Sequence, residues 1–184
     1  MRFRIVASVL FAAVVSVLPI AAQQPAKPQT GLRGPDIYWV PTPPAVVDAM
    51  LKLADIKPSD VVYDLGCGDG IIVTTAAQKY GARAVGIDID PQRVKEATER
   101  AQKMGVSDKV KIIQGDLFEA DIKEASIVTL YLLTSLNQKL MPKLKKELKP
   151  GTRVVSQSFN MGDEWPPEKE IQVDGRPVYL WTIK

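Results

Sequence analysis

Three aspartates and three glycines are spaced so that together they can bind a nucleotide-like ligand. Glycines at positions 66, 68 and 70 follow an apolar strand that carries Asp64 near its end. Glycine lets the backbone turn tightly and approach a ligand, because no Cβ stands in the way. A helix that begins at Ile71 presents unpaired N–H groups to the same place. This glycine-rich segment therefore predicts a nucleotide-like ligand across the end of the first strand.

Two further aspartates follow the next two predicted strands. Asp88 lies 20 residues after Gly68, where a carboxylate can accept hydrogen bonds from both hydroxyls of a ribose. Asp116 can accept from an exocyclic amine, and Leu117 can cover the face of a purine. Because the carboxyl ends of successive parallel strands line one crevice, we expect these acids to meet at one site.

The acids also restrict the charge of the ligand. A Rossmann dinucleotide site needs a third glycine at position 71, which holds isoleucine. Pyrophosphate would be repelled by Asp64 and Asp69, whereas an ammonium or a sulfonium group would be attracted. S-adenosylmethionine carries a ribose, an adenine amine, an ammonium and a sulfonium, and it carries no phosphate. It is therefore the ligand that this set of residues favours.

The elements that must position these residues alternate along the chain. Strands followed by helices imply right-handed crossovers and a parallel sheet covered on both faces. Near the end, Asp174-Gly175 predicts a hairpin, with a loop that Arg176-Pro177 makes longer than two residues. The predicted fold is thus α/β, a Rossmann-like, doubly wound, mostly parallel seven-stranded sheet with an antiparallel closing hairpin strand. We expect strands over 61–65, 84–89, 110–114, 126–132, 153–159, 170–173 and 178–183, and helices over 44–53, 71–80, 90–104 and 135–148.

The first 35 residues differ in composition from the rest of the chain. Two arginines precede an apolar run over 5–22, which is typical of a secretory signal peptide and just long enough for a marginal membrane anchor. Residues 23–35 carry three prolines and two glycines without apolar periodicity, which predicts a Pro-rich linker. We therefore expect a signal peptide or membrane anchor over 1–22, a linker over 23–35 and a folded domain over 36–184. The protein would be exported to the periplasm or anchored in the membrane, on a side that the flanking charges leave open.

Charge and composition exclude several classes of function. The net charge of +3 arises in the first 35 residues, which hold four basic side chains and no acid, while the rest holds 20 basic against 21 acidic side chains. A nucleic-acid partner is therefore not expected. The chain has no histidine and a single cysteine, Cys67, which argues against an internal disulfide, a metal site and Ser-His or Cys-His catalysis.

The glycines and acids resemble the conserved motifs of a known family. Asp64-x-Gly66-x-Gly68-x-Gly70, Asp88 and Gly115-Asp116-Leu117 are similar to motifs I, post-I and II of the class I S-adenosylmethionine-dependent methyltransferases. The resemblance covers residues 36–184. It implies that Asp64, Gly66, Cys67 and Gly68 hold the methionine part of S-adenosylmethionine, Asp88 the ribose, and Asp116 with Leu117 the adenine.

A narrower resemblance concerns the methyl acceptor. Tyr38-x-Val40-Pro41-Thr42-Pro43, Leu136-x-x-Lys139-Leu140 and Trp165 are similar to the small protein-lysine methyltransferases related to the enzymes that methylate the ATP-synthase c subunit. That resemblance implies a protein lysine as acceptor and an N-terminal membrane or targeting segment. The chain departs from it at Ile71, where those relatives carry arginine, and the departure bears on acceptor recognition more than on cofactor binding.

Candidates for catalysis are weaker than those for cofactor binding. Methyl transfer from a sulfonium needs alignment and desolvation more than acid–base help. Tyr131, near the end of the fourth strand, is the first candidate near the transferred methyl group, and Tyr38 and Thr42 in the preceding lid are the others. The Asn-Pro-Pro-Tyr type of motif is absent, which argues against an adenine or glutamine acceptor.

The function predicted from the sequence is methyl transfer from S-adenosylmethionine to a protein lysine by a monomer. Two alternatives use the same fold. One is a non-catalytic or differently acting nucleoside-binding module that is exported, and it is motivated by the apolar run over 5–22. The other is aminopropyl transfer, which needs further acids near the acceptor that Thr134-Ser135 does not supply.

Overall fold

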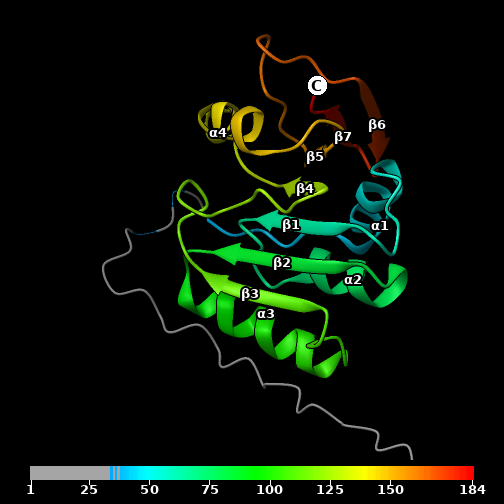
Figure 1. Ribbon diagram of the computed structural model, residues 1–184, viewed down its shortest axis with the longest axis vertical. Helices are drawn as coiled ribbons and strands as arrows, with labels where there is room; N and C mark the ends of the chain where they lie inside the picture. Colours follow the sequence, from blue (N-terminus) through cyan, green and yellow to red (C-terminus); the bar gives the residue numbers. More distant parts are fainter. Residues whose placement is uncertain (1–33, 35, 37) are drawn as a thin grey trace, which may run out of the picture.

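The computed structural model describes residues 34, 36 and 38–184 (Figure 1). The signal peptide or membrane anchor predicted over 1–22 lies outside the described residues, as does the linker predicted over 23–35 apart from Gly34. Within the part of the chain that is described, no helix is long and apolar enough to cross a membrane.

The described chain folds into helices and strands close to the predicted ones. The glycines at 70, 81 and 105, each with positive φ, border the helices as expected. In chain order the elements are α1 (Pro44–Leu53), β1 (Val61–Leu65), α2 (Ile71–Tyr80), β2 (Arg83–Asp88), α3 (Pro91–Lys103), β3 (Val110–Gln114), β4 (Ile127–Leu130), α4 (Thr134–Glu147), β5 (Arg153–Gln157), β6 (Lys169–Val173) and β7 (Arg176–Thr182).

One seven-stranded sheet runs through the molecule in the order β3-β2-β1-β4-β5-β7-β6. The strands from β3 to β5 pair in parallel, and β7 pairs antiparallel with both β5 and β6. The predicted fold class is therefore confirmed. The strand order reverses at β1, whose neighbours are β2 and β4, and ligands of doubly wound folds bind at the carboxyl ends of the strands beside such a reversal.

Two apolar cores lie on the two faces of the sheet, as Figure 1 shows from the placement of the helices. Helices α1, α2 and α3 cover one face, and α4 with the segment 116–125 covers the other. Because successive side chains of a strand point to opposite faces, Val62 of β1 joins one core while Val61 and Leu65 join the other. Every residue of β1 is buried, which fixes the glycine-rich loop that follows it in a rigid frame.

The structure corrects the predicted bounds of several strands. Strand β4 ends at Leu130 rather than at 132. Strand β5 ends at Gln157 rather than at 159, because Ser158 adopts a positive φ of +64° that no strand continues. The hairpin loop consists of only two residues, Asp174 and Gly175, and both have positive φ, as in the tight turns that suit paired strands. The longer loop expected from Arg176-Pro177 was wrong, because Arg176 already pairs with Val173.

Replacing Gly70 by alanine is expected to destabilise the fold strongly. Gly70 precedes α2 with a φ of +76°, and a Cβ there would lie 2.8 Å from the Cβ of Ala97 in α3. Positive φ and overpacking together should lower the free energy of unfolding by about 2–4 kcal/mol. Gly81 is a matched control, because its φ is +73° and the nearest atom to its added Cβ is Lys109 Nζ at 3.6 Å. Gly81→Ala should cost about 1 kcal/mol in urea denaturation, and equal losses in the two variants would contradict the packing argument.

Candidate active site

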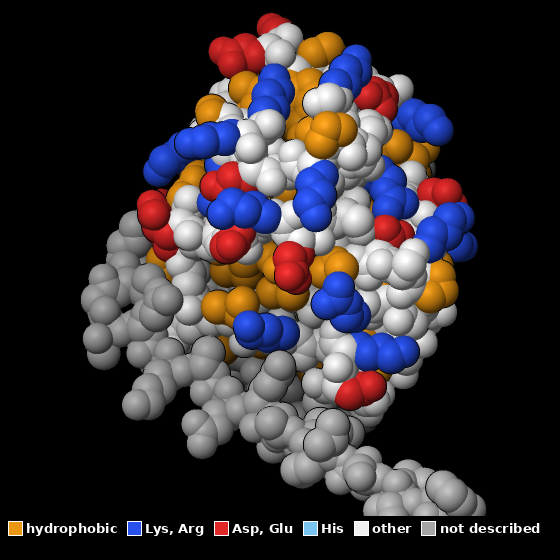
Figure 2. All heavy atoms as spheres, viewed as in Figure 1, with side chains coloured by type: hydrophobic (Ala, Val, Ile, Leu, Met, Phe, Trp, Pro, Cys, Tyr) orange, Lys and Arg blue, Asp and Glu red, His pale blue; other side chains and the backbone are white. Residues whose placement is uncertain are grey.

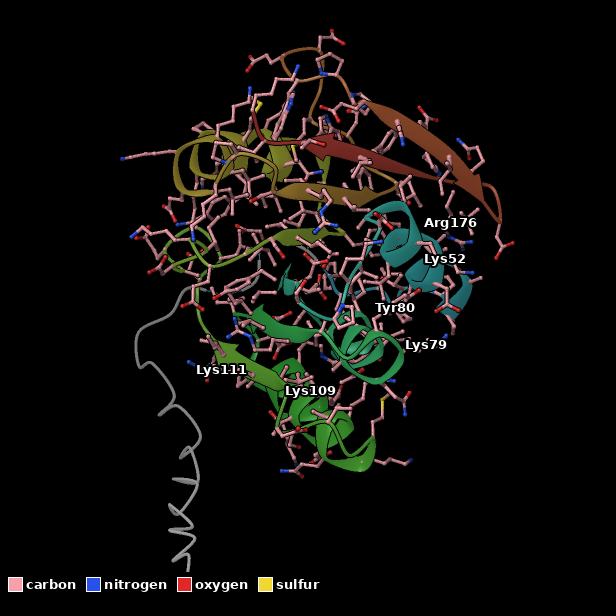
Figure 3. All side chains as sticks on the ribbon, turned by 45° about the vertical axis from the view of Figure 1, so that its right-hand side comes forward. Lys52, Lys79, Tyr80, Lys109, Lys111 and Arg176 are labelled. Atoms are coloured by element: carbon pink, nitrogen blue, oxygen red, sulfur yellow. The ribbon has the colours of Figure 1, made fainter. Side chains whose placement is uncertain are left out.

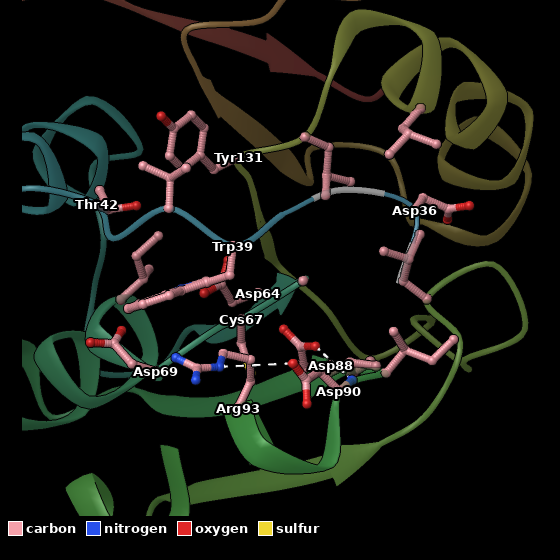
Figure 4. Close-up of a pocket in the computed structure, with 18 of the residues that line it drawn as sticks. Asp36, Trp39, Thr42, Asp64, Cys67, Asp69, Asp88, Asp90, Arg93 and Tyr131 are labelled. Carbon is pink, nitrogen blue, oxygen red and sulfur yellow. Dashed lines mark hydrogen bonds and ion pairs between the residues drawn. The ribbon is translucent and has the colours of Figure 1, made fainter. Parts of the chain in front are cut away.

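A cavity of about 530 Å³ opens at the carboxyl ends of β1, β2 and β4. Figure 4 shows it between the glycine-rich loop and the segment over 38–42, which we call the strap. The three predicted aspartates all line this cavity, and so do the acceptor candidates. Its lining includes Tyr38, Thr42, Asp64, Gly66, Cys67, Asp88, Asp116, Leu117 and Tyr131.

The glycine-rich loop is held against β2 by its own backbone. The N–H groups of Gly66 and Cys67 donate to the Ile87 carbonyl oxygen at 2.8 and 3.0 Å. Gly66 and Gly68 have φ values of +84° and +53°, which only glycine adopts without strain. The N–H of Gly68 donates to the Asp88 carboxylate at 2.8 Å. The acid predicted to bind a ribose therefore also holds the loop in place.

Asp64 is buried at the end of β1 and is the most perturbed of the predicted acids. Its side chain is 3 % exposed and accepts a hydrogen bond from the Thr129 hydroxyl at 2.8 Å. Burial raises the pKa of Asp64 to about 7, and the negative charges of Asp88 and Asp69 add to the rise, while the bond from Thr129 opposes it. A cationic group bound beside this carboxyl would favour its ionised form.

Asp88 and Asp116 each accept hydrogen bonds from nearby backbone N–H groups. Asp88 accepts from the N–H of Asp90 at 3.0 Å in addition to Gly68, and burial raises its pKa although both N–H groups oppose the rise. Asp116 accepts from the N–H of Phe118 at 2.9 Å. A carboxylate has about four lone-pair sites, so both acids retain acceptor capacity for a ligand in the cavity.

Cys67 lies in the loop as a packing residue. Its side chain is 5 % exposed, and its sulfur fills the space where Gly86 of β2 has no Cβ. Burial raises the pKa of the Cys67 thiol well above its usual value, and the negative charges of Asp64 and Asp88 add to the rise. The thiol is therefore neutral at physiological pH, and only the backbone of Cys67 is available to a ligand.

Trp39 and Arg93 also line the cavity, and the sequence did not predict either of them as a site residue. The Trp39 indole lies against the glycine-rich loop, because a Cβ on Gly68 would overlap its ring. The Arg93 guanidinium, from α3, stands over the same ring with its carbon 4.4 Å from the centroid. Figure 4 shows Trp39 between the strap and Arg93. The only sequence signal was an aromatic pair beside a proline-rich segment, and it did not indicate this partner.

The acceptor candidates lie in different surroundings. Tyr131 follows β4, and its ring stacks on that of Phe159 with the centroids 6.2 Å apart. Thr42 is 7 % exposed, directly before α1. Tyr38 is 98 % exposed on the strap, so its side chain extends into solvent at the mouth. Tyr131 with Phe159 therefore forms the aromatic wall of the cavity, and Phe159 was not predicted.

Six aspartates and one arginine make up the charged lining of the cavity. The expected repulsion of pyrophosphate needs one correction, because Asp69 is not an isolated charge. The Arg100 guanidinium donates to its carboxylate and to its carbonyl oxygen. Asp64, which is buried, and Asp88, which is partly buried, have no ion pair to a basic side chain among the described residues, and they carry the argument instead.

These residues fit S-adenosylmethionine. A backbone cradle without Cβ atoms lies beside a buried carboxyl of raised pKa, as a ligand with an ammonium group requires. Asp88 at the end of β2 retains acceptor sites for ribose hydroxyls, and Asp116 with Leu117 lies at the end of the cavity next to β3. No residue of the described lining other than Arg93 offers a cation to a phosphate.

Comparison with known proteins yields one family for this fold and cavity. The model of the ANTKMT methyltransferase domain matches residues 64–169. A protein-lysine N-methyltransferase from Saccharolobus islandicus is 47 % identical over 154 residues, which cover 81 % of this chain and 95 % of that protein. A ribosomal protein L11 methyltransferase from Pelotomaculum thermopropionicum is 32 % identical over 101 residues, which cover 55 % of this chain and 33 % of that protein.

A solved structure is similar over most of its length. It is described as an RNA methyltransferase from Salinibacter ruber in complex with S-adenosyl-L-homocysteine, and it is 58 % identical with a TM-score of 0.77. The match covers 78 % of this chain and 94 % of that one. The similar proteins thus share a methyltransferase description, and their names differ in the acceptor.

Proposed function

Because this chain belongs to the methyltransferase family defined by the ANTKMT methyltransferase domain, we propose that it methylates the side-chain amine of a protein lysine. It is an S-adenosylmethionine-dependent methyltransferase of class I fold. The part that we propose is that the acceptor is lysine. It is supported by the similar protein-lysine N-methyltransferase and by the chemistry of the cavity.

The charge of the cavity is the observation that carries the proposal. The aspartates of the lining outnumber its one arginine even when Asp69 is paired with Arg100 and Asp90 with Arg93. The lining therefore has a negative potential, which attracts a lysine ammonium and repels a phosphate backbone. Leu132, Leu133, Leu136 and Phe159 supply an apolar wall beside these acids. A lysine side chain that lies against this apolar wall is desolvated. Desolvation lowers the pKa of its ammonium group and so favours the neutral amine, which can accept a methyl group.

The residues of the chain divide into two groups in this proposal. Gly66, Gly68 and Asp64 hold the methionine part of the cofactor, Asp88 its ribose, and Asp116 with Leu117 its adenine. S-adenosylmethionine supplies a methyl group on a positively charged sulfur, a good leaving group that needs little acid catalysis. Tyr131 and Phe159 line the acceptor side, and Thr42 and the strap border it. The protein contributes alignment and exclusion of water rather than a nucleophile.

RNA is the competing acceptor, because the similar protein from Salinibacter ruber is described as an RNA methyltransferase. The charge distribution argues against it here. Lysine and arginine side chains are interspersed with acids on the face in Figure 2. Lys52, Lys79 and Lys109, which Figure 3 labels, lie at the ends of α1 and α2 and directly before β3. They are therefore at the end of the sheet where the parallel strands begin, whereas the cavity opens where those strands end. Lys79 is also paired with Asp48 at 2.7 Å.

Transfer of a labelled methyl group tests the acceptor class. The full chain is incubated with labelled S-adenosylmethionine and three acceptors: lysine-containing peptides, the same peptides with arginine at each lysine, and RNA. We expect label in the lysine peptides alone. Label in the RNA alone would contradict the lysine acceptor and leave the methyltransferase assignment intact, whereas no label despite tight cofactor binding would favour a non-catalytic module.

We also propose that the apolar run over 5–22 directs the protein to the membrane or across it. The proposal rests on the sequence pattern, because the run lies outside the described residues. Fractionation followed by N-terminal sequencing of the mature protein tests it. A mature chain that begins near residue 23 supports a signal peptide, an intact chain in the membrane fraction supports an anchor, and an intact chain in the cytosol contradicts both.

A further inference from the structure

Phe159 is presented to the cavity by a tight turn at the end of β5. The N–H of Phe159 donates to the Gln157 carbonyl oxygen at 2.8 Å, two residues back, across Ser158. Ser158 has a φ of +64°, so the turn is of the rare γ type with a non-glycine residue at its centre. Such a conformation persists only where the surrounding structure imposes it, and such sites cluster where ligands bind.

Buried polar groups hold this turn from two sides. The Ser156 hydroxyl donates to the Phe159 carbonyl oxygen at 2.6 Å, and the amide of Asn137, which is fully buried in α4, donates to the same oxygen at 3.0 Å. Asn137 also reaches the Asn160 carbonyl oxygen at 3.3 Å. On the other side, the N–H of Ser158 donates to the Pro177 carbonyl oxygen of β7 at 2.8 Å. The clamp leaves the Phe159 ring little freedom to leave the cavity.

A second observation marks the same place. Gln157 is fully buried, and neither atom of its side-chain amide has a hydrogen-bond partner among the described residues. Unpaired buried amides are unfavourable, and native proteins tolerate few of them. Strain at Ser158 and an unpaired amide at Gln157 thus adjoin Phe159, which stacks on Tyr131 and lines the cavity. Core packing alone does not require either feature.

We propose that the turn over 156–160 sets acceptor specificity by fixing Phe159 as the aromatic surface on which the acceptor's cationic side chain is oriented. The inference rests on the proposed lysine acceptor. Aromatic faces attract alkylammonium groups, and methylation leaves the positive charge in place while it removes N–H donors. Phe159 and Tyr131 can therefore bind the lysine ammonium before it loses a proton to become the attacking amine, and the methylated ammonium after the methyl group has left the sulfonium. Ser156 and Asn137 act as positioning residues through Phe159.

The test compares Phe159→Leu and Phe159→Tyr with the unchanged chain. Leucine retains an apolar side chain and removes the aromatic face, so KM for a lysine peptide should rise about 3- to 30-fold while kcat changes less. The affinity for S-adenosylhomocysteine, measured by calorimetry without acceptor, should stay the same. Tyrosine should restore KM. Tyr80 lies at the end of α2 and is labelled in Figure 3. Tyr80→Leu is the matched aromatic control and should leave KM unchanged.

Ser158→Gly provides a variant whose fold is not in question, because glycine adopts positive φ without strain. It loosens the turn, and we expect KM for the lysine peptide to rise about 3-fold, at the low end of the range for loss of the aromatic face, with the affinity for S-adenosylhomocysteine unchanged. The inference is overturned if the unchanged chain methylates lysine and the Phe159→Leu variant keeps its KM and its distribution of methylated products. If the unchanged chain transfers no methyl group to lysine, the proposed function fails first, and the two failures are distinguished.

Discussion

Replacing Asp88 by alanine is expected to weaken the binding of S-adenosylhomocysteine by about 100-fold or more. Two contributions are lost together. The ribose loses a charged hydrogen-bond acceptor, and the N–H of Gly68, which donates to Asp88 at 2.8 Å, loses the partner that holds the glycine-rich loop. A hydrogen bond to a charged group contributes about 1.5–3 kcal/mol, and each 1.4 kcal/mol corresponds to a tenfold change in affinity. Calorimetric titration measures the effect directly.

Asp121→Ala is the control for this experiment, because Asp121 is an exposed aspartate outside the cavity lining. It should bind S-adenosylhomocysteine like the unchanged chain. Asp88→Asn is the informative intermediate, since it keeps the size of the side chain and one acceptor oxygen, and we expect a loss of about tenfold. Full affinity in Asp88→Ala would contradict the placement of the ribose at the end of β2.

The affinity for S-adenosylhomocysteine is expected to fall steeply below pH 7. Burial raises the pKa of Asp64 to about 7 in the free protein, so this carboxyl is protonated below that pH. The ligand's ammonium favours the carboxylate, and binding at lower pH must therefore release a proton. The affinity should fall by up to about tenfold per pH unit, or about 15-fold between pH 7 and pH 5.5, and should level off above about pH 8. Calorimetry in two buffers of different ionisation enthalpy counts the released proton.

Asp64→Asn separates this effect from other titrating groups. The variant cannot ionise, so its affinity should be low at every pH and nearly independent of pH over this range. A residual dependence is assigned to Asp88, whose pKa is also raised by burial. The same shift predicts the stability of the free protein. Because the folded-state pKa of Asp64 lies above its usual value of 3.8, the stabilisation from its protonation is complete below pH 3.8 and is lost as the pH rises through 7. An unchanged pH profile in Asp64→Asn would contradict this account.

The sequence predicted most of the fold because its signals are local. Asp90 caps α3 by accepting from the N–H of Gln92 at 2.8 Å, as the Asp-Pro pair predicts. Gly81 ends α2, because glycine readily adopts the positive φ that follows the last turn of a helix. The end of β5 was not predictable in this way. No glycine or proline between Arg153 and Phe159 signals the end of the strand, and only contacts with α4 and β7 impose the turn at Ser158.

The residues of the site also fall into a group that local sequence signals predict and a group that they do not predict. Most of the residues expected to bind the cofactor lie at strand ends, so the parallel sheet brings them to one cavity. Gly68 is the exception, because Trp39 covers it and it is not part of the lining. Trp39, Arg93 and Phe159 reach that cavity from the strap, from α3 and from beyond β5. Their positions depend on tertiary packing and on a cation over an aromatic ring, neither of which leaves a pattern of fixed spacing in the sequence. These three residues are also the ones that bear most on which acceptor the protein methylates.

If the protein transfers the methyl group of S-adenosylmethionine to lysine in this cavity, the modified atom must be a lysine side-chain nitrogen. Mapping that atom is the most direct test. The full chain is incubated with trideuteromethyl S-adenosylmethionine and proteins from its own cells, and the labelled peptides are sequenced by mass spectrometry. We expect the heavy methyl group on lysine side-chain nitrogens, and far less of it in a parallel reaction with Asp88→Ala. Label on RNA, or on protein atoms other than lysine nitrogen, would contradict it.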